Sequence, residues 1–461
     1  MWRLLAAVAT GVIITLGPVA VPQSAQAQER ISVAEGRELA ARLYSLRQFR
    51  ALREVTRALL QADPEDIGIL ILLARAEQGL GDTEAADMAA TLAWQNAQTE
   101  SEKLAAALTV AEIATNADRL TRAQFWLRRA ANHTRTPRED AFVARAFSQV
   151  RRANPLSIQL DFGMSPSDNV NNGTSNEYVT FAFLPDAFSD LEWIVPPDER
   201  PLSGIELSLS ADLRYRLAQG ARSRTSLEAG VFGKTYIMSA EAREDAPEVS
   251  GAALSYGQAY LGLGRQWVPE GTRTTYSASL RYILEADADG LSAHRLSGDI
   301  GAQMPLSETM TLSYGAGLER ARYTTGETAD RATLRGHWAL DLANEDVLSL
   351  SARLVRSRSD AMDRDYRSAT VSLGYDFGQV TDALSLSVVA EQRWQIHDAV
   401  SLDPSGREDS QQSLKLSAGF PNMQVYGFEP VVTLRHQKTE SSVPSYDSVT
   451  TTMGLFLRSR F

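Results

Sequence analysis

Two patterns of hydrophobic and polar positions divide this chain. From residue 30 to about 152, apolar residues recur at the spacing of amphipathic helices, as at Leu39, Leu43 and Leu46. From Pro155 to the last residue, apolar and polar residues alternate, which is the period of a β-strand. The sequence therefore predicts an α + β multidomain protein, with a helical region followed by a β-region.

The helical region is predicted to consist of paired helices. Polar turns recur at roughly the 34-residue period of tetratricopeptide (TPR) units, and they fall at 47–48, 79–82 and 115–118. Other positions match the aromatic, closing proline and small residues of such a unit: Phe49, Pro64, Ala74, Gly81, Ala86 and Ala93. A last helix over 137–151 would cap the stack. We expect a TPR-like solenoid over residues 30–152, with an unrelated helical bundle as the alternative.

The alternating region has the pattern of a transmembrane β-barrel. In 205–216, apolar residues alternate with Glu, Ser, Asp and Arg, and similar alternation covers 276–284, 310–319 and 333–342. The segments are about ten residues or longer and number about fourteen, an even number, as in outer-membrane barrels. The predicted lipid-facing residues include Leu209, Leu312, Leu340 and Leu455, and the predicted lumen-facing residues include Ser208, Ser313, Asp341 and Gly454.

The connections between the predicted strands also favour a barrel over a soluble β-sandwich. Those after even-numbered strands look tight: 218–220, 269–271, 305–307, 343–346 and 421–423. Those after odd-numbered strands look longer and more polar: 165–203, 240–250, 324–331, 357–366, 398–410 and 437–447. Short periplasmic turns and longer outer loops are typical of outer-membrane barrels. We expect the barrel to occupy 155–461, with the helical domain in the periplasm.

Both ends of the chain carry export signals. Arg3, an apolar stretch over 4–20 and Ala25-Gln26-Ala27 predict a signal peptide over 1–27, with an N-terminal membrane anchor as the alternative. No later stretch reaches the roughly 20 apolar residues of a membrane helix. The last strand leads in phase to Phe461, a terminal aromatic of the kind that the barrel-assembly machinery is thought to bind.

Composition narrows the chemistry. The chain has 461 residues and no cysteine, which excludes disulfides, thiolate metal sites, thiol nucleophiles and an acylated N-terminal cysteine. Its formal net charge of −11 argues against a nucleic-acid partner, which requires clustered Lys and Arg.

No catalytic, cofactor-binding or metal-binding residues are predicted, and the protein is not expected to be an enzyme. Five histidines are scattered without metal-ligand spacing: His133, His294, His337, His397 and His436. The predicted lumen phase carries charges of both signs: Arg214, Arg216, Lys234, Arg281, Arg295, Asp299, Arg335, Asp341, Arg353, Asp376, Glu391, Arg393, Arg435, Arg458 and Arg460. Lumen solvation and cross-strand pairing are favoured over a substrate track.

The arrangement resembles the surface lipoprotein assembly modifier family. Three stretches carry the resemblance: Asn154-Pro155-Leu156 with 165–171, then 426–430, and then 441–446 with the terminal Arg460-Phe461. The usual Ser-Asn pair of the last outer loop reads Ser441-Ser442 here. The resemblance implies a role in moving lipoproteins across the outer membrane of a Gram-negative bacterium to the cell surface.

The partners expected for this protein are outer-membrane lipid, a client lipoprotein or periplasmic chaperone that binds the helices, and the barrel-assembly machinery, which would bind Phe461. Two other functions remain open. One is a polymer-export porin, since polysaccharide secretins also join helical repeats to barrels, usually with many more repeats. The other is a plain diffusion porin, which would leave the helical repeats unexplained.

Overall fold

The computed structural model describes residues 32–180, 191–381, 383–423 and 428–459. The predicted signal peptide and Arg460-Phe461 lie outside the described residues. The chain divides into two compact units, one up to Ala89 and one from Ala90 on. No described helix is both long and apolar enough to cross a membrane.

Seven helices precede the barrel strands in the described part of the chain. They are α1 (Val33–Ser45), α2 (Phe49–Ala62), α3 (Ile67–Gly79), α4 (Thr83–Asn96), α5 (Glu100–Asn116), α6 (Leu120–Ala131) and α7 (Pro137–Ala153). The first residues of α1, α3, α5 and α7 are 33, 67, 100 and 137, which gives spacings close to the predicted repeat period. The predicted helical repeat, including its last helix, is confirmed.

The same turn joins the two helices of each pair. Each turn has three residues, and its middle residue has a positive φ: Arg47 at 55°, Gly81 at 85° and Asp118 at 57°. Each turn also has the hydrogen bond of a Schellman motif, from Gln48 to Leu43, from Asp82 to Glu77 and from Arg119 to Ala114. This geometry satisfies the last carbonyls of the first helix and directs the second helix back along it.

Local sequence also explains where the pairs begin and how they pack. Ser32, Thr99 and Thr136 form capping boxes with the glutamates three residues later, which starts α1, α5 and α7. In the first unit, Phe49 lies over Gly79, where an added Cβ would come within 2.4 Å of its ring. The aromatic residue identified in the sequence thus packs against the last residue of α3.

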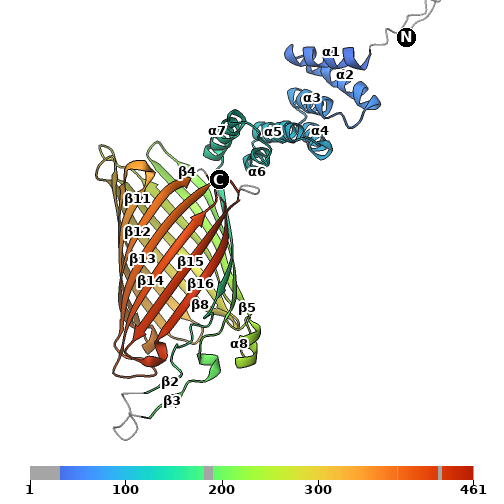
Figure 1. Cartoon of the computed structure of the whole chain (residues 1–461). Coiled ribbons are helices and arrows are strands. Elements are labelled where there is room, and N and C mark those ends of the chain that lie inside the picture. The colour runs from blue at the N-terminus through green and yellow to red at the C-terminus, as the bar shows by residue number, and fades with distance from the viewer. Residues whose placement is uncertain (1–31, 181–190, 382, 424–427, 460–461) are drawn as a thin grey trace, which may run out of the picture. The chain divides into compact units, whose positions relative to one another are not determined.

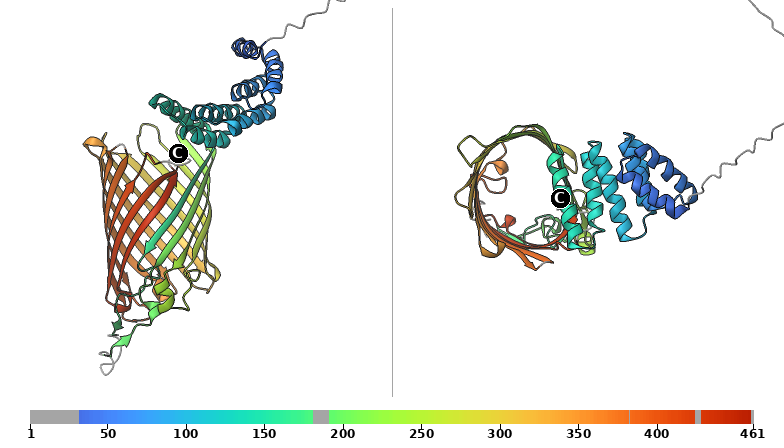
Figure 2. Two further views of the ribbon diagram at one scale, coloured as in Figure 1. Left: turned by 45° about the vertical axis from the view of Figure 1, so that its right-hand side comes forward. Right: turned by 90° about the horizontal axis from the view of Figure 1, so that it is seen from above.

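Fourteen antiparallel strands close into a barrel, and Figure 2 shows the ring from above. Its strands are β1 (Leu156–Ser167), β4 (Gly204–Gln219), β5 (Ser223–Met238), β6 (Tyr256–Trp267), β7 (Thr275–Asp287), β8 (Gly290–Pro305), β9 (Met310–Tyr323), β10 (Thr328–Asp341), β11 (Val347–Ser359), β12 (Tyr366–Thr381), β13 (Leu384–His397), β14 (Arg407–Gly419), β15 (Phe428–Ser441) and β16 (Ser448–Ser459). Each strand pairs with its sequence neighbour in the barrel, and β1 closes the ring against β16. The predicted strand number and fold class are confirmed.

The first link of the barrel carries elements of its own. It contains the short strands β2 (Tyr178–Val179) and β3 (Trp193–Ile194) and the turn η1 (Pro197–Glu199), and the link between β5 and β6 contains α8 (Ala240–Asp245). These elements gather at one end of the barrel (Figure 1). Val170 and Leu202 pack there with Met238, Ala242 and Ala246 in a small apolar core. We call this the loop end; the turns after even-numbered barrel strands form the opposite, turn end.

Several predicted loop boundaries are wrong. Three links at the loop end are shorter than predicted, because they span only 324–327, 360–365 and 442–447. The link between β7 and β8 has two residues, 288–289. Conversely, the turn-end link 268–274 is longer than predicted. The loop end has longer links than the turn end mainly because of two links, 168–203 and 239–255. The reason is that the polar ends of strands, read as loops in the sequence, continue the paired ladder at the loop end.

The strand register keeps the two predicted faces apart. Leu209 lies opposite Phe162 and Gly233, and Leu455 lies opposite Met164 and Val432, all on the apolar face. Ser313 lies opposite Gln303 and His337 on the polar face. The strands are 12 to 16 residues long, more than the roughly 9–11 that a tilted membrane strand needs. Their ends therefore extend beyond the hydrocarbon region.

Candidate functional site

The polar face of the strands lines the lumen, because its side chains make contacts that skip a strand. Arg281 on β7 reaches Glu228 on β5 at 2.9 Å. The residue between them in the register is Gly262 on β6, where an added Cβ would lie 2.7 Å from Arg281 Cγ. Side chains converge across three strands only on the concave side of a barrel.

A second contact follows the same rule. The Tyr260 hydroxyl on β6 donates to Asp212 on β4 at 2.5 Å. It passes over Gly230 on β5, where a Cβ would lie 2.3 Å from the tyrosine ring. Glycine at these two lumen positions permits the crossing, and alternation alone did not identify this role.

Carboxylates and arginines are paired on the β4–β10 part of the lumen wall. Glu228, only 7% exposed, also contacts Arg214 at 3.3 Å. Glu319 contacts Arg331 at 2.9 Å and Arg295 at 3.4 Å, and Arg295 also contacts Glu285. Asp299 accepts a hydrogen bond from Arg335 at 2.7 Å. The predicted cross-strand pairing therefore accounts for this half of the wall.

The β11–β15 part of the wall differs. Among the described residues, no carboxylate makes an ion pair with Arg353, Arg393, Lys415 or Arg435. Lys415 and Arg435 lie directly opposite each other on β14 and β15, and like charges at such positions destabilise a sheet. We call these four residues the basic lumen wall. It could contact an anionic segment of a passing molecule.

The histidines do not come together. No group of three or more His, Cys, Asp or Glu residues that could hold a metal ion occurs in the described part of the chain. His337 lies in the lumen phase, with its Nδ1 2.8 Å from Ser351 Oγ. His294 instead lies in the outward phase beside Tyr282.

The loop end brings two distant motifs together. Asn169, which is 3% exposed, donates from Nδ2 to the carbonyls of Gly173 at 2.9 Å and Val449 at 3.3 Å. Asn176 donates to the Pro444 carbonyl at 2.9 Å, and the Thr451 N–H donates to Asp168 at 2.7 Å. The segment after β1 is thus fastened to the last hairpin across the closing seam. The sequence supplied both motifs but no sign of their contact.

The last hairpin also has a cationic contact at this end. The Arg407 guanidinium lies 3.8 Å from the centre of the Tyr446 ring, and burial raises the pKa of Tyr446. Nearby, a hydrogen bond from Ser401 at 2.6 Å lowers the pKa of Asp363. These contacts hold the links at the loop end in a defined arrangement.

We expect Asn169→Ala to destabilise the folded barrel. The change leaves the buried N–H and carbonyl of Gly173 without their partner and costs about 1–3 kcal/mol. The temperature at which the purified barrel loses its compact electrophoretic form measures the effect. Asn422→Ala, at an exposed turn position, is the control. Equal thermal stability of both variants would show that the Asn169 contacts do not fasten the seam.

A family model decides what kind of barrel this is. The model of the surface lipoprotein assembly modifier family matches residues 157–457, which is more than half of the chain. The chain belongs to the surface lipoprotein assembly modifier family. It is an outer-membrane β-barrel protein involved in surface lipoprotein assembly, and this family and fold are those of a transport or assembly protein rather than of an enzyme class. The family predicted from the sequence is confirmed.

The motif just before the matched region has a local structural reason. The Asn154 side chain accepts a hydrogen bond from the Leu156 N–H at 3.0 Å. This bond closes the end of α7 and sets the extended backbone from which β1 begins.

Solved structures similar to either half were also found. The translocator chaperone SycD from Yersinia enterocolitica matches with 17% identity and a TM-score of 0.24, covering 27% of this chain and 88% of that one. OccAB3 from Acinetobacter baumannii matches with 8% identity and a TM-score of 0.34, covering 66% and 99%. A bacterial polysaccharide outer membrane secretin matches with 8% identity and a TM-score of 0.35, covering 66% and 98%. A comparison with curated protein sequences gives no match.

Proposed function

We propose that this protein carries client lipoproteins to the cell surface, with helices α1 to α7 capturing the client in the periplasm and the barrel providing the route. Membership of the surface lipoprotein assembly modifier family is the observation that carries the proposal. On this account, residues 1–27 are a signal peptide, 30–152 a periplasmic domain and 155–461 the outer-membrane barrel.

The connectivity of the chain supports this orientation. Helix α7 ends at Ala153 and β1 begins at Leu156, so the helical region joins the barrel at the turn end. The longest links, 168–203 and 239–255, lie at the loop end. Outer-membrane barrels place short turns in the periplasm and long loops outside. A client in the periplasm would therefore meet the helices before the barrel.

An aromatic cluster with one exposed ring, that of Phe125, lies on the helices and is suited to binding polypeptide. The Arg129 guanidinium lies 4.5 Å from the centre of the Phe125 ring and 4.9 Å from that of Trp126. Trp94 packs edge-on against Trp126 with ring centres 5.2 Å apart. Phe125 is nevertheless 49% exposed. Aromatic residues and arginine around an accessible apolar surface are typical of binding hot spots.

We expect Phe125→Ala to weaken client binding by roughly tenfold, about 1.4 kcal/mol. The readout is photo-crosslinking of the full chain to the lipoproteins whose display requires it. Val33→Ala, at an equally exposed apolar position at the start of α1, should leave crosslinking unchanged. Unchanged crosslinking in Phe125→Ala would show that this cluster is not part of the client-binding surface.

A second function has one observation in its favour. The basic lumen wall would suit export of an anionic polymer, because its charges lack carboxylate partners among the described residues. Cells that lack the protein distinguish the two functions. Loss of a surface polysaccharide with normal lipoprotein display would favour polymer export, and the reverse would favour lipoprotein display.

A further inference from the structure

Five arginines lie on the outward, lipid-facing side of the barrel at the loop end. The register places Arg320 opposite Leu296, Arg356 opposite Ala332 and Arg367, and Arg358 opposite Asp330, all in the same phase as the lipid-facing leucines. The five are Arg320, Arg322, Arg356, Arg358 and Arg367, and we call them the arginine patch. Of the five, only Arg358 lies in a stretch predicted from the sequence to be a loop, 357–366.

Most of this charge is not neutralised by the protein. Arg320 makes an exposed ion pair with Asp330 at 3.7 Å. Arg356 lies 2.9 Å from Asp365 and 3.7 Å from Asp398. Across the described ranges, no ion pair involves Arg322, Arg358 or Arg367, and all three are exposed. The patch is therefore a cationic surface beside an apolar one.

An apolar hollow of about 1380 Å³ adjoins the patch. Small residues form its floor on adjacent strands: Gly298 on β8, Ala316 on β9 and Ala332 on β10. An added Cβ at Gly298 would meet only the tip of Leu280, at 3.9 Å, so the space above this floor is open. Leu280, Leu296 and Leu318 rise around it.

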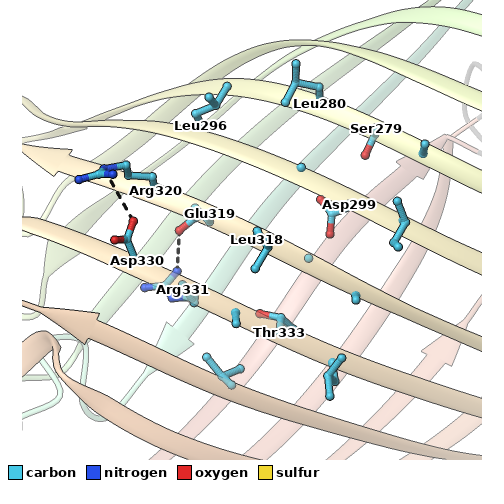
Figure 3. A pocket seen from close by; sticks show the side chains of 18 of the residues that line it. Ser279, Leu280, Leu296, Asp299, Leu318, Glu319, Arg320, Asp330, Arg331 and Thr333 are labelled. Atoms are coloured by element: carbon cyan, nitrogen blue, oxygen red, sulfur yellow. Dashed lines mark hydrogen bonds and ion pairs between the residues drawn. The ribbon is translucent and has the colours of Figure 1, made fainter.

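Figure 3 shows the hollow together with Arg320, the one member of the arginine patch that is labelled there. The labelled neighbours Glu319 and Arg320 make separate ion pairs, with Arg331 and Asp330 respectively. Because successive side chains of a strand point to opposite faces, the first pair lies on the lumen side and the second on the outward side. The arginine patch is thus separate from the lumen charges.

This combination matches one class of ligand. Arginine binds phosphate oxygens through a planar pair of N–H donors, and it does so with more geometric specificity than lysine. The adjoining hollow would bury acyl chains, which is favourable in proportion to the apolar area covered. We propose that the arginine patch and the hollow bind one acylated glycolipid with a phosphorylated headgroup, of the lipid A type. The loop end then contacts the outer leaflet, so this inference rests on the orientation proposed above.

The phosphate groups distinguish this lipid from a neutral or zwitterionic one. A zwitterionic phospholipid carries its own cationic group beside the phosphate and leaves the arginine charge less well compensated. A lipid A molecule with two phosphates can engage Arg322, Arg358 and Arg367 together. Its acyl chains would lie along the floor at Gly298, Ala316 and Ala332.

Native mass spectrometry of the full-length protein in detergent tests the proposal, with lipid A, dephosphorylated lipid A and phosphatidylethanolamine as probes. We expect lipid A to remain bound preferentially. In the variant Arg322→Gln/Arg358→Gln/Arg367→Gln, lipid A binding should weaken roughly tenfold or more. The control Arg273→Gln/Lys438→Gln removes charges outside the patch and should bind as the unmodified protein does. Ala316→Phe fills the floor and should also weaken binding, whereas Ala418→Phe on β14 should not.

Each outcome bears on the proposal. Equal binding of lipid A with and without phosphate, or unchanged binding in the triple variant, would overturn it. Preference for phosphatidylethanolamine would overturn it as well. The compact electrophoretic form of each variant confirms that its barrel is folded. The triple arginine-to-glutamine variant changes none of the apolar residues of the lipid-facing side. No client enters this measurement, so its failure would leave the display function standing, and loss of display would not affect lipid binding.

Discussion

Leu209→Arg should reduce the stability of the membrane-inserted barrel by about 2–4 kcal/mol. Leu209 lies on the outward face of β4, is 45% exposed and is flanked in the register by Phe162 and Gly233. A guanidinium there must enter hydrocarbon without a partner. Denaturant-induced unfolding of the barrel in lipid vesicles measures the change.

Ser210→Arg on the same strand is the matched control. Ser210 faces the lumen, and its hydroxyl lies 3.4 Å from Asp161 Oδ2. The other carboxylate oxygen of Asp161 is buried without a hydrogen-bond partner, so a new arginine there gains a partner. We expect Ser210→Arg to cost far less than Leu209→Arg. Equal costs on the two faces would contradict the assignment of the lipid and lumen phases.

Deleting residues 30–150 while keeping the signal peptide should abolish display of the client but not assembly of the barrel. Every barrel strand pairs with two other barrel strands, and β1 closes the ring by pairing with both β4 and β16. The strand pairing therefore does not require the helices. The proposed capture surface is lost with the deletion. The amount of folded barrel in the outer membrane and the protease accessibility of the client are measured together. Normal display by the shortened chain would refute the delivery role of the helices.

The features predicted correctly from the sequence are those set by local periodicity. Helix pairs follow from apolar spacing and from the turns at Arg47, Gly81 and Asp118, each of which depends on neighbouring residues. The lipid and lumen phases follow from alternation, because a shift of one residue would turn every side chain to the other face. The register between strands then keeps Leu209 or Ser313 on the predicted side.

The features that the sequence did not predict depend on contacts between distant strands. Arg281 and Glu228 meet only because Gly262 lies between them. Asn169 reaches Val449 across the closing seam, where the first and last strands of the barrel become neighbours. No local pattern carries this information.

The arginine patch shows a different limit. Charged residues near a predicted turn indicate a loop, and Arg358 lies in such a stretch. In the structure, the hydrogen-bonded ladder between β10 and β11 continues through Arg358 to Ser359. The charge of Arg358 therefore lies on a strand, at the loop end of the apolar face. Charge alone therefore does not mark where a strand ends.

Proteolysis of intact cells with and without this protein tests whether it places lipoproteins on the outer surface. Peptides released by an external protease identify the accessible lipoproteins, and whole-cell lysates give their total amounts. We expect at least one lipoprotein to become inaccessible without the protein while its total amount is unchanged, and we expect re-expression to restore access. An identical set of accessible lipoproteins in both kinds of cell, with the folded barrel present in the first, would show that the protein does not place lipoproteins on the surface.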